Sequence, residues 1–425
     1  MSRTNTAAQS THHGSVGQLV ILGASVRALA ESAARAGWDV HAADLFCDLD
    51  LQAIATAAVP AASGIGDAAT GYPWSLIAAA AGFPPSAAWC YTGAIENHPD
   101  LIDAIAGVRS LAGNPSDVIR PLRDPVHLTA AASLAGLSFP ETRPSPDSVP
   151  LDGSWLVKPR AGAGGRGIRR WTRAVADDHA IHHATVEIQH HIWQRYTSGT
   201  PLSASFCFTQ GATQLLGVSR QLIGEPWCHA GPFAWCGAVT IHGAGSRPDH
   251  ERLVASLARL GDVLAERFRP VGLVGVDLLV DAAGHITVIE VNPRPTASME
   301  LFERSGAGSI AGRHLAACGC ATPSAITIEQ PLPLPASTWA KAVLFASQPT
   351  PVTQPLIDRL TCETAPWTQA DGSWPAIADI PRPEQTIAAG APVVTIFAAA
   401  PTTDDALAIL RDRVARIDVL LAARV

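Results

Sequence analysis

The sequence predicts an α/β protein, and the strongest sign of this class is the order of elements near its N-terminus. A short apolar run at residues 18–22 ends at Gly23, and an alanine-rich helical stretch follows at 28–36. Gly37 ends the helix, and a second apolar run occupies residues 38–43. Strand, helix and strand in this order are typical of parallel strands joined by a crossover helix. We therefore expect a Rossmann-like parallel sheet at the start of the chain.

The middle of the chain mixes short strands with helices, and its clearest unit is a hairpin. Apolar residues 271–280 and 286–291 read as two strands with a turn at 281–284. Other apolar runs predict strands at 87–91, 154–159, 188–196, 202–208, 343–346 and 393–397, and helical periodicity predicts helices at 99–106, 251–268 and 403–423. Proline-rich stretches at 140–150 and 323–335 mark connections between units.

Composition excludes several classes of protein. The chain has 425 residues, with 30 Lys and Arg against 37 Asp and Glu, and no basic block that would bind nucleic acid. No apolar run reaches the roughly 20 residues of a membrane span, and residues 1–17 lack the apolar core of a signal peptide. We therefore expect a cytoplasmic protein that binds neither nucleic acid nor membrane. The turn at 23–27 lacks the second and third glycines of the dinucleotide fingerprint, which disfavours NAD.

The eight cysteines are scattered, and we interpret them as reduced thiols. One group offers three zinc ligands, namely Cys228, His229 and Cys236. A fourth ligand is not evident and the stretch is rich in aromatic residues, so buried thiols packed beside tryptophan are the favoured interpretation.

A lysine beside a glycine-rich loop is the first feature that carries chemistry. Only two of the basic residues are lysines, Lys158 and Lys341, so a lysine at a site suggests a need for a compact ammonium rather than a guanidinium. Lys158 lies near the end of a predicted strand, and four glycines follow it closely: Gly162, Gly164, Gly165 and Gly167. Backbone N–H groups of such a loop can close around polyphosphate oxygens while the lysine neutralises their charge. Lys341 begins an apolar strand, and we interpret it as structural.

Acidic and amide side chains in the predicted hairpin form the second feature. Glu290 and Asn292 are two residues apart on one strand and therefore share a face. Asp277, on the partner strand, can point to the same place. Three oxygen ligands with room for phosphates suit Mg²⁺. Arg294, just beyond the strand, can reach a phosphoryl group during its transfer.

Together these motifs resemble the ATP-grasp superfamily, and the resemblance covers most of the chain. More narrowly, residues 22–32, 43–48, 93–97 and 292–300 resemble an ATP-grasp family of methanogens and methylotrophs. That family implies a link to methanopterin-type or methanofuran-type one-carbon cofactors.

The resemblance implies an α/β fold built from three units. These are a Rossmann-like pre-ATP-grasp domain at 16–115, a two-subdomain ATP-grasp domain at 116–320 and a small β-rich unit at 321–425, after a disordered tail at 1–15. The C-terminal unit carries no evident catalytic group, and we expect it to act as a lid or buttress for the ATP-grasp core.

The resemblance also implies ATP and two Mg²⁺ ions, for which Mn²⁺ can substitute. Lys158 would contact the α- and β-phosphates, the glycine loop would cover the triphosphate, and the metal ligands would be Asp277, Glu290 and Asn292. The hinge strand that receives adenine would contain Gln194, Arg195 and Tyr196, and Gln194 is the candidate for ribose recognition.

Two departures from the superfamily pattern bear on nucleotide binding. Many relatives carry a second ATP-contacting lysine in an Asp-Lys step, but here Asp124 is followed by Pro125. Arg120 or Arg123 is the candidate replacement. The acidic residue of the Gly-x-Glu-x-Ser hinge pattern is also missing, since residues 199–203 read Gly-Thr-Pro-Leu-Ser.

The activity implied by the resemblance is ATP-dependent ligation of a small-molecule carboxylate to an amine through an acyl phosphate. Lys158 and Arg294 would be the catalytic residues. Candidate substrate contacts are Ser25, Arg27, Glu96, Asn97, Ser298 and Glu300. In the one-carbon cofactor context an amino acid such as glutamate is a candidate component. The alternatives are a non-catalytic ATP-binding protein and a phosphotransferase, and the oligomeric state stays open with a homodimer as one option.

Overall fold

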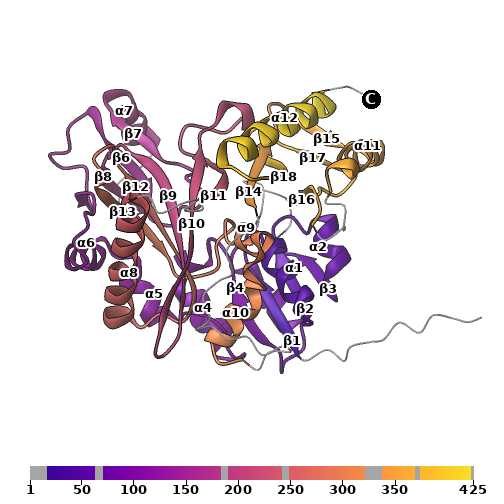
Figure 1. The fold of residues 1–425 in the computed structure, drawn as a ribbon, viewed down its shortest axis with the longest axis horizontal. Helices are drawn as coiled ribbons and strands as arrows, with labels where there is room; N and C mark the ends of the chain where they lie inside the picture. The colour runs from indigo at the N-terminus through magenta and orange to yellow at the C-terminus, as the bar shows by residue number, and fades with distance from the viewer. Residues whose placement is uncertain are drawn as a thin grey trace, which may run out of the picture.

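The computed structural model describes residues 17–62, 70–182, 190–241, 248–320, 337–368 and 374–422. Figure 1 shows an N-terminal α/β layer beside a large twisted sheet, with the C-terminal helix lying across the far end of that sheet. The predicted tail at 1–15 and the proline-rich stretch at 323–335 lie outside the described residues. The fold class predicted from the sequence is confirmed.

The N-terminal layer contains a four-stranded parallel sheet with strand order β3-β2-β1-β4. Its strands are β1 (Gln18–Leu22), β2 (Asp39–Asp44), β3 (Ala57–Pro60) and β4 (Ala88–Tyr91), and its helices are α1 (Arg27–Arg35), α2 (Leu49–Ile54), α3 (Ser75–Ala81) and α4 (Pro99–Ala106). The predicted strand–helix–strand start is confirmed. Residues 19–22 of β1 are fully buried, because helices cover both faces of a parallel sheet.

A small antiparallel sheet follows, with strand order β5-β8-β6-β7. It is formed by β5 (Thr142–Arg143), β6 (Asp152–Pro159), β7 (Arg169–Thr172) and β8 (His191–Arg195), and the neighbouring helices are α5 (Ser116–Leu122), α6 (Pro125–Leu134) and α7 (Arg173–His182). Three buried tryptophans form its own core, Trp155, Trp171 and Trp193. This core fixes the orientation of β6, which carries Lys158.

The largest sheet has eight strands in the order β13-β12-β9-β10-β11-β14-β18-β16, and every pairing in it is antiparallel. Its strands are β9 (Thr200–Phe208), β10 (Thr213–Ile223), β11 (Trp235–Ile241), β12 (Gly272–Val280), β13 (Ile286–Asn292), β14 (Thr338–Phe345), β16 (Ile377–Ala378) and β18 (Pro392–Ala400). The predicted β12–β13 hairpin is confirmed. Strands β14 and β18 continue the same sheet, and the domain boundaries drawn from the sequence stay predictions.

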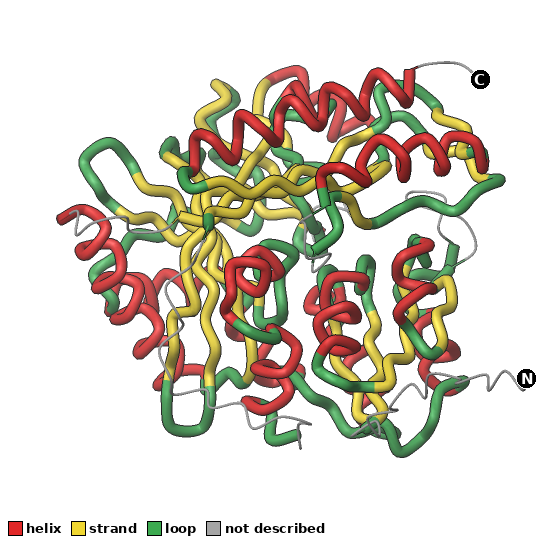
Figure 2. Tube along the Cα trace, turned by 45° about the vertical axis from the view of Figure 1, so that its right-hand side comes forward, coloured by secondary structure: helices red, strands yellow, loops and turns green. Residues whose placement is uncertain are grey.

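Long helices cover the large sheet on its outer faces (Figure 2). Helix α8 (Pro248–Phe268) packs on β10, and α12 (Thr403–Ala422) packs on β14 and β18. Helix α10 (Ile310–Ala317) contacts both α1 and β12, which joins the N-terminal layer to the large sheet. Within the described residues, no helix has the length and apolar character needed to cross a membrane.

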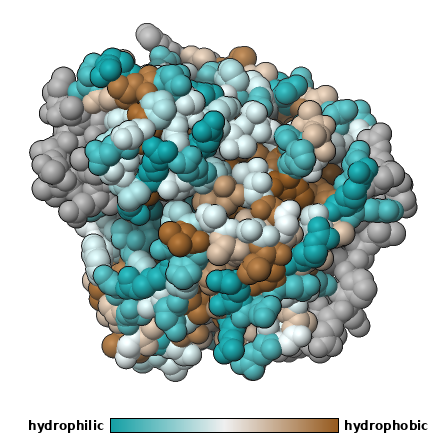
Figure 3. Space-filling model, turned by 90° about the vertical axis from the view of Figure 1, so that its left-hand side faces the viewer, coloured by the Kyte–Doolittle hydropathy of each residue, from teal (hydrophilic) through white to brown (hydrophobic). Residues whose placement is uncertain are grey.

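The remaining described elements are short. They are helices α9 (Glu300–Phe302) and α11 (Gln354–Thr364), the π-helical turn Glu303–Ala307, the 3-10 turns Ile95–Asn97, Pro226–Cys228 and Ala365–Trp367, and the two-stranded sheet of β15 (Thr350–Val352) and β17 (Gln385–Ile387). The face shown in Figure 3 mixes apolar and hydrophilic side chains, with the apolar ones gathered mainly across its middle.

Candidate active site

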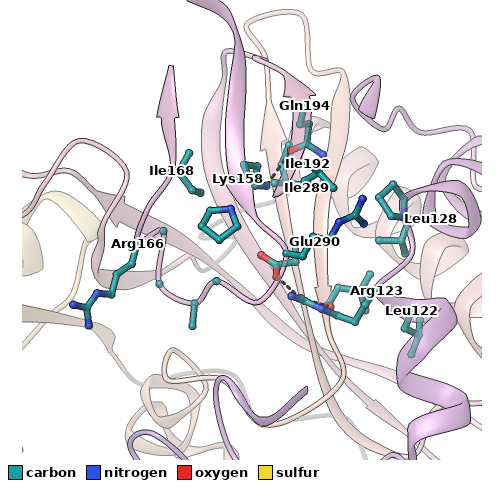
Figure 4. A pocket seen from close by; sticks show the side chains of 18 of the residues that line it. Leu122, Arg123, Leu128, Lys158, Arg166, Ile168, Ile192, Gln194, Ile289 and Glu290 are labelled. Atoms are coloured by element: carbon teal, nitrogen blue, oxygen red, sulfur yellow. Dashed lines mark hydrogen bonds and ion pairs between the residues drawn. The ribbon is translucent and has the colours of Figure 1, made fainter. Parts of the chain in front are cut away.

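A cavity of about 130 Å³ lies between the small sheet and the β12–β13 hairpin. Part of its wall is apolar, formed by Leu122, Leu128, Phe139, Ile168, Ile192 and Ile289. The rest is charged or polar, and it includes Arg123, Lys158, Gln194 and Glu290 (Figure 4). An apolar wall suits a flat heterocyclic ring, and adjacent cations suit phosphate. This cavity therefore has the chemical character of a nucleotide site.

Lys158 projects into this cavity from the end of β6. Its Nζ donates a hydrogen bond to Oε1 of Gln194 on β8 at 3.0 Å, and the Gln194 amide donates in turn to Oγ1 of Thr142 at 3.2 Å. Burial lowers the pKa of Lys158, and the charge of Glu290 partly opposes that effect. The ammonium is therefore held in a fixed orientation, in surroundings where its charge is poorly hydrated.

Arg123 is the second cation of the cavity. It follows α5 and pairs with Glu290 of β13, and its other terminal nitrogen donates to Oδ1 of Asn97 at 2.8 Å. Arg120 lies elsewhere, with its side chain 54% exposed and paired with Asp100 at 2.6 Å. Of the two arginines considered as replacements for the missing lysine, only Arg123 lines the cavity.

The glycine-rich loop contacts two other parts of the molecule. The carbonyl of Gly162 accepts a hydrogen bond from Nδ2 of Asn97 at 3.1 Å, and that of Gly164 accepts one from Trp235 N at 3.0 Å. A Cβ atom on Gly165 would lie 1.8 Å from the carbonyl oxygen of Phe233, and φ there is +78°. Glycine is therefore required at this position by both space and backbone conformation. Figure 4 shows Arg166 of this loop directed away from the other labelled residues.

The three predicted metal ligands come together on the β12–β13 hairpin. Asp277 is paired with Glu290 across the ladder, and Asn292 donates to Oδ2 of Asp277 at 3.0 Å. Burial and the nearby Glu290 charge raise the pKa of Asp277 to about 6. Burial also favours the neutral form of Glu290, but Arg123 and Lys158 outweigh it and lower that pKa. Two carboxylates and an amide oxygen this close fit a divalent cation, because a cation relieves their mutual repulsion.

Arg294 lies beside this hairpin and is held by Glu96 of the N-terminal layer. Its Nε and one terminal nitrogen lie 2.8 and 2.7 Å from Oε1 of Glu96, and the same terminal nitrogen lies 3.4 Å from Oδ1 of Asn292. Burial alone would lower the pKa of Arg294, but the Glu96 charge outweighs it and the pKa is raised. A Cβ on Gly93 would contact this guanidinium at 3.4 Å, so glycine gives the arginine room.

Two of the candidate substrate residues, Arg27 and Glu300, are instead bound to each other. Arg27 contacts Glu300 at 2.8 Å and Asp379 at 2.9 Å, and Lys341 also pairs with Glu300 and donates to the Ala297 carbonyl at 3.1 Å. This buried network joins the N-terminal layer to β14 and to the turn after β13. Lys341 therefore has the structural role expected of it, whereas no sequence motif marks Asp379 as a partner of Arg27.

The other predicted contacts are dispersed. Ser298 is buried, with its hydroxyl 3.2 Å from that of Thr296, whereas Ser25 is exposed. Among the hinge residues, Gln194 lines the cavity but Arg195 and Tyr196 do not. The Tyr196 ring is stacked by the Arg170 guanidinium, 3.7 Å from the ring centroid. The buried hydroxyl of Tyr72 has no hydrogen-bond partner among the described residues, and no sequence motif marks this residue.

Comparisons with known proteins agree on the fold. Residues 123–298 match the family model of the ATP-grasp domain. No protein of curated function matches the sequence significantly. Three solved structures illustrate the likeness, all at TM-scores of 0.64–0.65.

The first is an L-amino acid ligase from Bacillus licheniformis, 14% identical, with 93% of this chain and 96% of that chain covered. The second is biotin carboxylase from Campylobacter jejuni, 14% identical over 94% and 95%. The third is carboxyaminoimidazole ribonucleotide synthase from Aspergillus clavatus complexed with ATP, 15% identical over 94% and 99%. At such identities the likeness concerns the fold. Residues 123–298 thus match the ATP-grasp domain model, and the chain as a whole shares the overall fold of these proteins.

Proposed function

We propose that the protein is an enzyme, an ATP-dependent ligase that joins a small-molecule carboxylate to an amine through an acyl phosphate. The observation that carries this proposal is the convergence of Lys158 and Arg123 with the Asp277–Glu290–Asn292 group around one cavity. Cations for phosphate and oxygen ligands for a divalent metal meet there on separate elements. The solved structures with this fold include a ligase and two enzymes named for carboxylation chemistry, which supports the same reaction class.

In this proposal the nucleotide occupies the cavity with its base against the apolar wall. Lys158 and Arg123 bind the phosphate oxygens, and backbone N–H groups of residues 162–167 cover them. Asp277, Glu290 and Asn292 would hold two Mg²⁺ ions, which supply charge neutralisation for the β- and γ-phosphates. Oε2 of Glu290 accepts no hydrogen bond among the described residues, so Arg123 leaves this oxygen available to a metal.

The reaction then needs positioning more than covalent chemistry by the protein. A carboxylate oxygen attacks the γ-phosphorus and ADP leaves, which gives the acyl phosphate. The amine attacks the carbonyl carbon and phosphate leaves with formation of the amide. Arg294, adjacent to Asn292, stabilises the negative charge that develops on oxygen in both steps. An amino acid such as glutamate, in a one-carbon cofactor context, is the first substrate to test.

An ADP-release screen of the purified protein tests the proposal. Amino acids, glutamate among them, serve as carboxylates with Mg²⁺ and ATP, and hydroxylamine serves as a general nucleophile. Hydroxamate formation with stoichiometric ADP, lost in Glu290→Gln, supports the ligase. Saturable ATP binding with no turnover of any acid would favour the non-catalytic ATP-binding protein. ADP release with a phosphorylated product and no hydroxamate would favour the phosphotransferase.

A further inference from the structure

Asn97 connects the second cation of the cavity to the glycine-rich loop. Its Oδ1 accepts a hydrogen bond from a terminal nitrogen of Arg123 at 2.8 Å, and its Nδ2 donates to the carbonyl oxygen of Gly162 at 3.1 Å. The side chain is half-buried and extends from the 3-10 turn Ile95–Asn97. A single amide group therefore joins the N-terminal layer, the end of α5 and the loop that borders the cavity.

The amide of Asn97 suits its two partners in one orientation only. A guanidinium can only donate and a backbone carbonyl can only accept, so Oδ1 must face Arg123 and Nδ2 must face Gly162. A carboxylate of the same size would accept from Arg123 but would meet the Gly162 carbonyl without a proton. An aliphatic side chain would lose both hydrogen bonds. Asparagine is therefore the side chain of this length that serves both partners.

The turn that carries Asn97 is fixed by its own contacts. Ala94 precedes the turn with a φ of +77°, a left-handed conformation that is uncommon for a residue with a Cβ atom. Its carbonyl accepts from Asn97 N at 3.2 Å, and the neighbouring Glu96 is 2% exposed and paired with Arg294 at 2.7 Å. Two adjacent side chains of this turn thus hold the two arginines of the proposed mechanism, Arg123 and Arg294.

The glycine-rich loop depends on contacts of this kind for its position. Three of its four glycines have a positive φ, which glycine adopts without strain. The same freedom gives the loop many alternative conformations, so it opens readily unless other elements hold it. The hydrogen bond from Asn97 to Gly162 is one such contact, and the hydrogen bond from Trp235 N to the Gly164 carbonyl is another.

We propose that Asn97 is a positioning residue that couples phosphate binding at Arg123 to closure of the glycine-rich loop. This inference rests on the proposed function, from which it takes ATP as the ligand. Among the described residues, Arg123 donates to Glu290, the Val291 carbonyl and Asn97, and to no residue of the loop. A phosphate bound by Arg123 fixes the guanidinium, which in turn fixes the amide that holds the Gly162 carbonyl. Because such coupling is reciprocal, the closed loop also favours the phosphate-binding orientation of Arg123.

Hydrogen exchange of the glycine-rich loop without nucleotide is the first test. It compares the wild type with Asn97→Ala, Asn97→Asp and Arg123→Ala. The control is Asp100→Ala, because Asp100 belongs to the same layer but its side chain is 77% exposed and does not line the cavity. We expect loop exchange about fivefold faster in the first three variants, and unchanged in the control. Asn97→Asp separates the two contacts, since aspartate can pair with Arg123 but has no proton for the Gly162 carbonyl.

Binding of the non-hydrolysable analogue adenylyl imidodiphosphate with Mg²⁺, followed by calorimetry, is the second test. Asn97→Ala should weaken this binding by about tenfold. The double variant of Asn97→Ala and Arg123→Ala should bind within about twofold of Arg123→Ala alone, because residues that act as one unit have non-additive effects. Thermal unfolding of each variant shows whether the fold is retained.

Two results would overturn the coupling while leaving the nucleotide site intact. One is loop exchange in Arg123→Ala equal to that of the wild type, because the loop would then be held independently of this cation. The other is additive effects of the two substitutions on the affinity for the analogue. The expected exchange and binding, without ADP release from any acid, would overturn the ligase proposal alone, because neither measurement needs turnover. No saturable binding of the analogue to the wild type would overturn both.

Discussion

The guanidinium of Arg123 is paired with the carboxylate of Glu290, and this contact joins the end of α5 to β13 at the nucleotide cavity. The side chain of Arg123 is 17% exposed and that of Glu290 is 35% exposed, so both are partly dehydrated. The charge of Glu290 outweighs burial and raises the pKa of Arg123, and Arg123 in turn lowers the pKa of Glu290. Both groups therefore remain charged throughout the physiological pH range.

Arg123→Ala should raise the KM for ATP by at least tenfold. The variant removes a charged partner of the phosphates, and such hydrogen bonds contribute about 1.5–3 kcal/mol. Arg120→Ala is the matched control, because that side chain is 54% exposed and paired with Asp100 away from the cavity. Steady-state ADP release at varied ATP concentration measures both. Equal KM values for ATP in the two variants would show that Arg123 does not contribute to ATP binding.

Lys158→Arg should lower kcat/KM for ATP by roughly a hundredfold, although the charge is conserved. The compact ammonium donates to Gln194 at 3.0 Å within a crowded strand end, and a longer planar guanidinium cannot reproduce that geometry. ATP-dependent turnover and nucleotide binding by calorimetry should both decline. Wild-type activity in this variant would show that charge alone suffices at position 158.

Gly165→Ala should prevent the glycine-rich loop from docking. Its Cβ would lie 1.8 Å from the Phe233 carbonyl oxygen, which is backbone and cannot rotate away. Gly164→Ala is the control: it also has a positive φ, of +61°, but nothing lies within 4 Å of its Cβ. We expect faster hydrogen exchange at residues 162–167 and weaker ATP binding in Gly165→Ala. Equal hydrogen exchange and ATP binding in the two variants would show that the positive φ, rather than the clash with Phe233, determines the result.

Local patterns were enough to predict much of this fold. The apolar run of β1 and the β12–β13 hairpin have clear periodicity, so their positions and the shared face of Glu290 and Asn292 were predictable. The choice of Arg123 over Arg120 depends on the orientation of α5 against β13, which no local pattern specifies. The partnership of Arg27 with Asp379 joins residues 352 positions apart, and Tyr72 is in a segment without any motif. Such contacts depend on tertiary packing alone.

Truncation after residue 322 should give aggregated or unstable protein. Strands β14 and β18 continue the large sheet from β11, and their loss would expose β11 as an unpaired edge together with the apolar cluster beneath α12. It would also remove Lys341 and Asp379, partners of the buried Glu300 and Arg27. Size-exclusion chromatography and thermal unfolding measure the result. A monodisperse fragment with native ATP affinity would contradict the expected buttress role.

Acidification should destabilise the protein through His314 of α10. The ring is 2% exposed, and its Nδ1 accepts from Leu273 N at 3.0 Å while Nε2 lies 3.0 Å from the Ala112 carbonyl oxygen. This arrangement needs the neutral ring with its proton on Nε2, because a second proton would face the Leu273 N–H. Burial lowers the pKa of His314 from 6.5 to about 4. The unfolded chain therefore binds a proton more readily than the folded one between these pH values.

The contribution of His314 to the free energy of unfolding is therefore fully present above about pH 6.5. It declines as the pH falls toward 4, by a maximum of about 3 kcal/mol. Urea unfolding of wild type and His314→Gln at pH 7.5 and 4.5 isolates the contribution, since glutamine can accept and donate but does not titrate. The advantage of wild type over the variant should shrink by about 2–3 kcal/mol at the lower pH. A constant difference between wild type and His314→Gln would show that His314 titrates equally in both states.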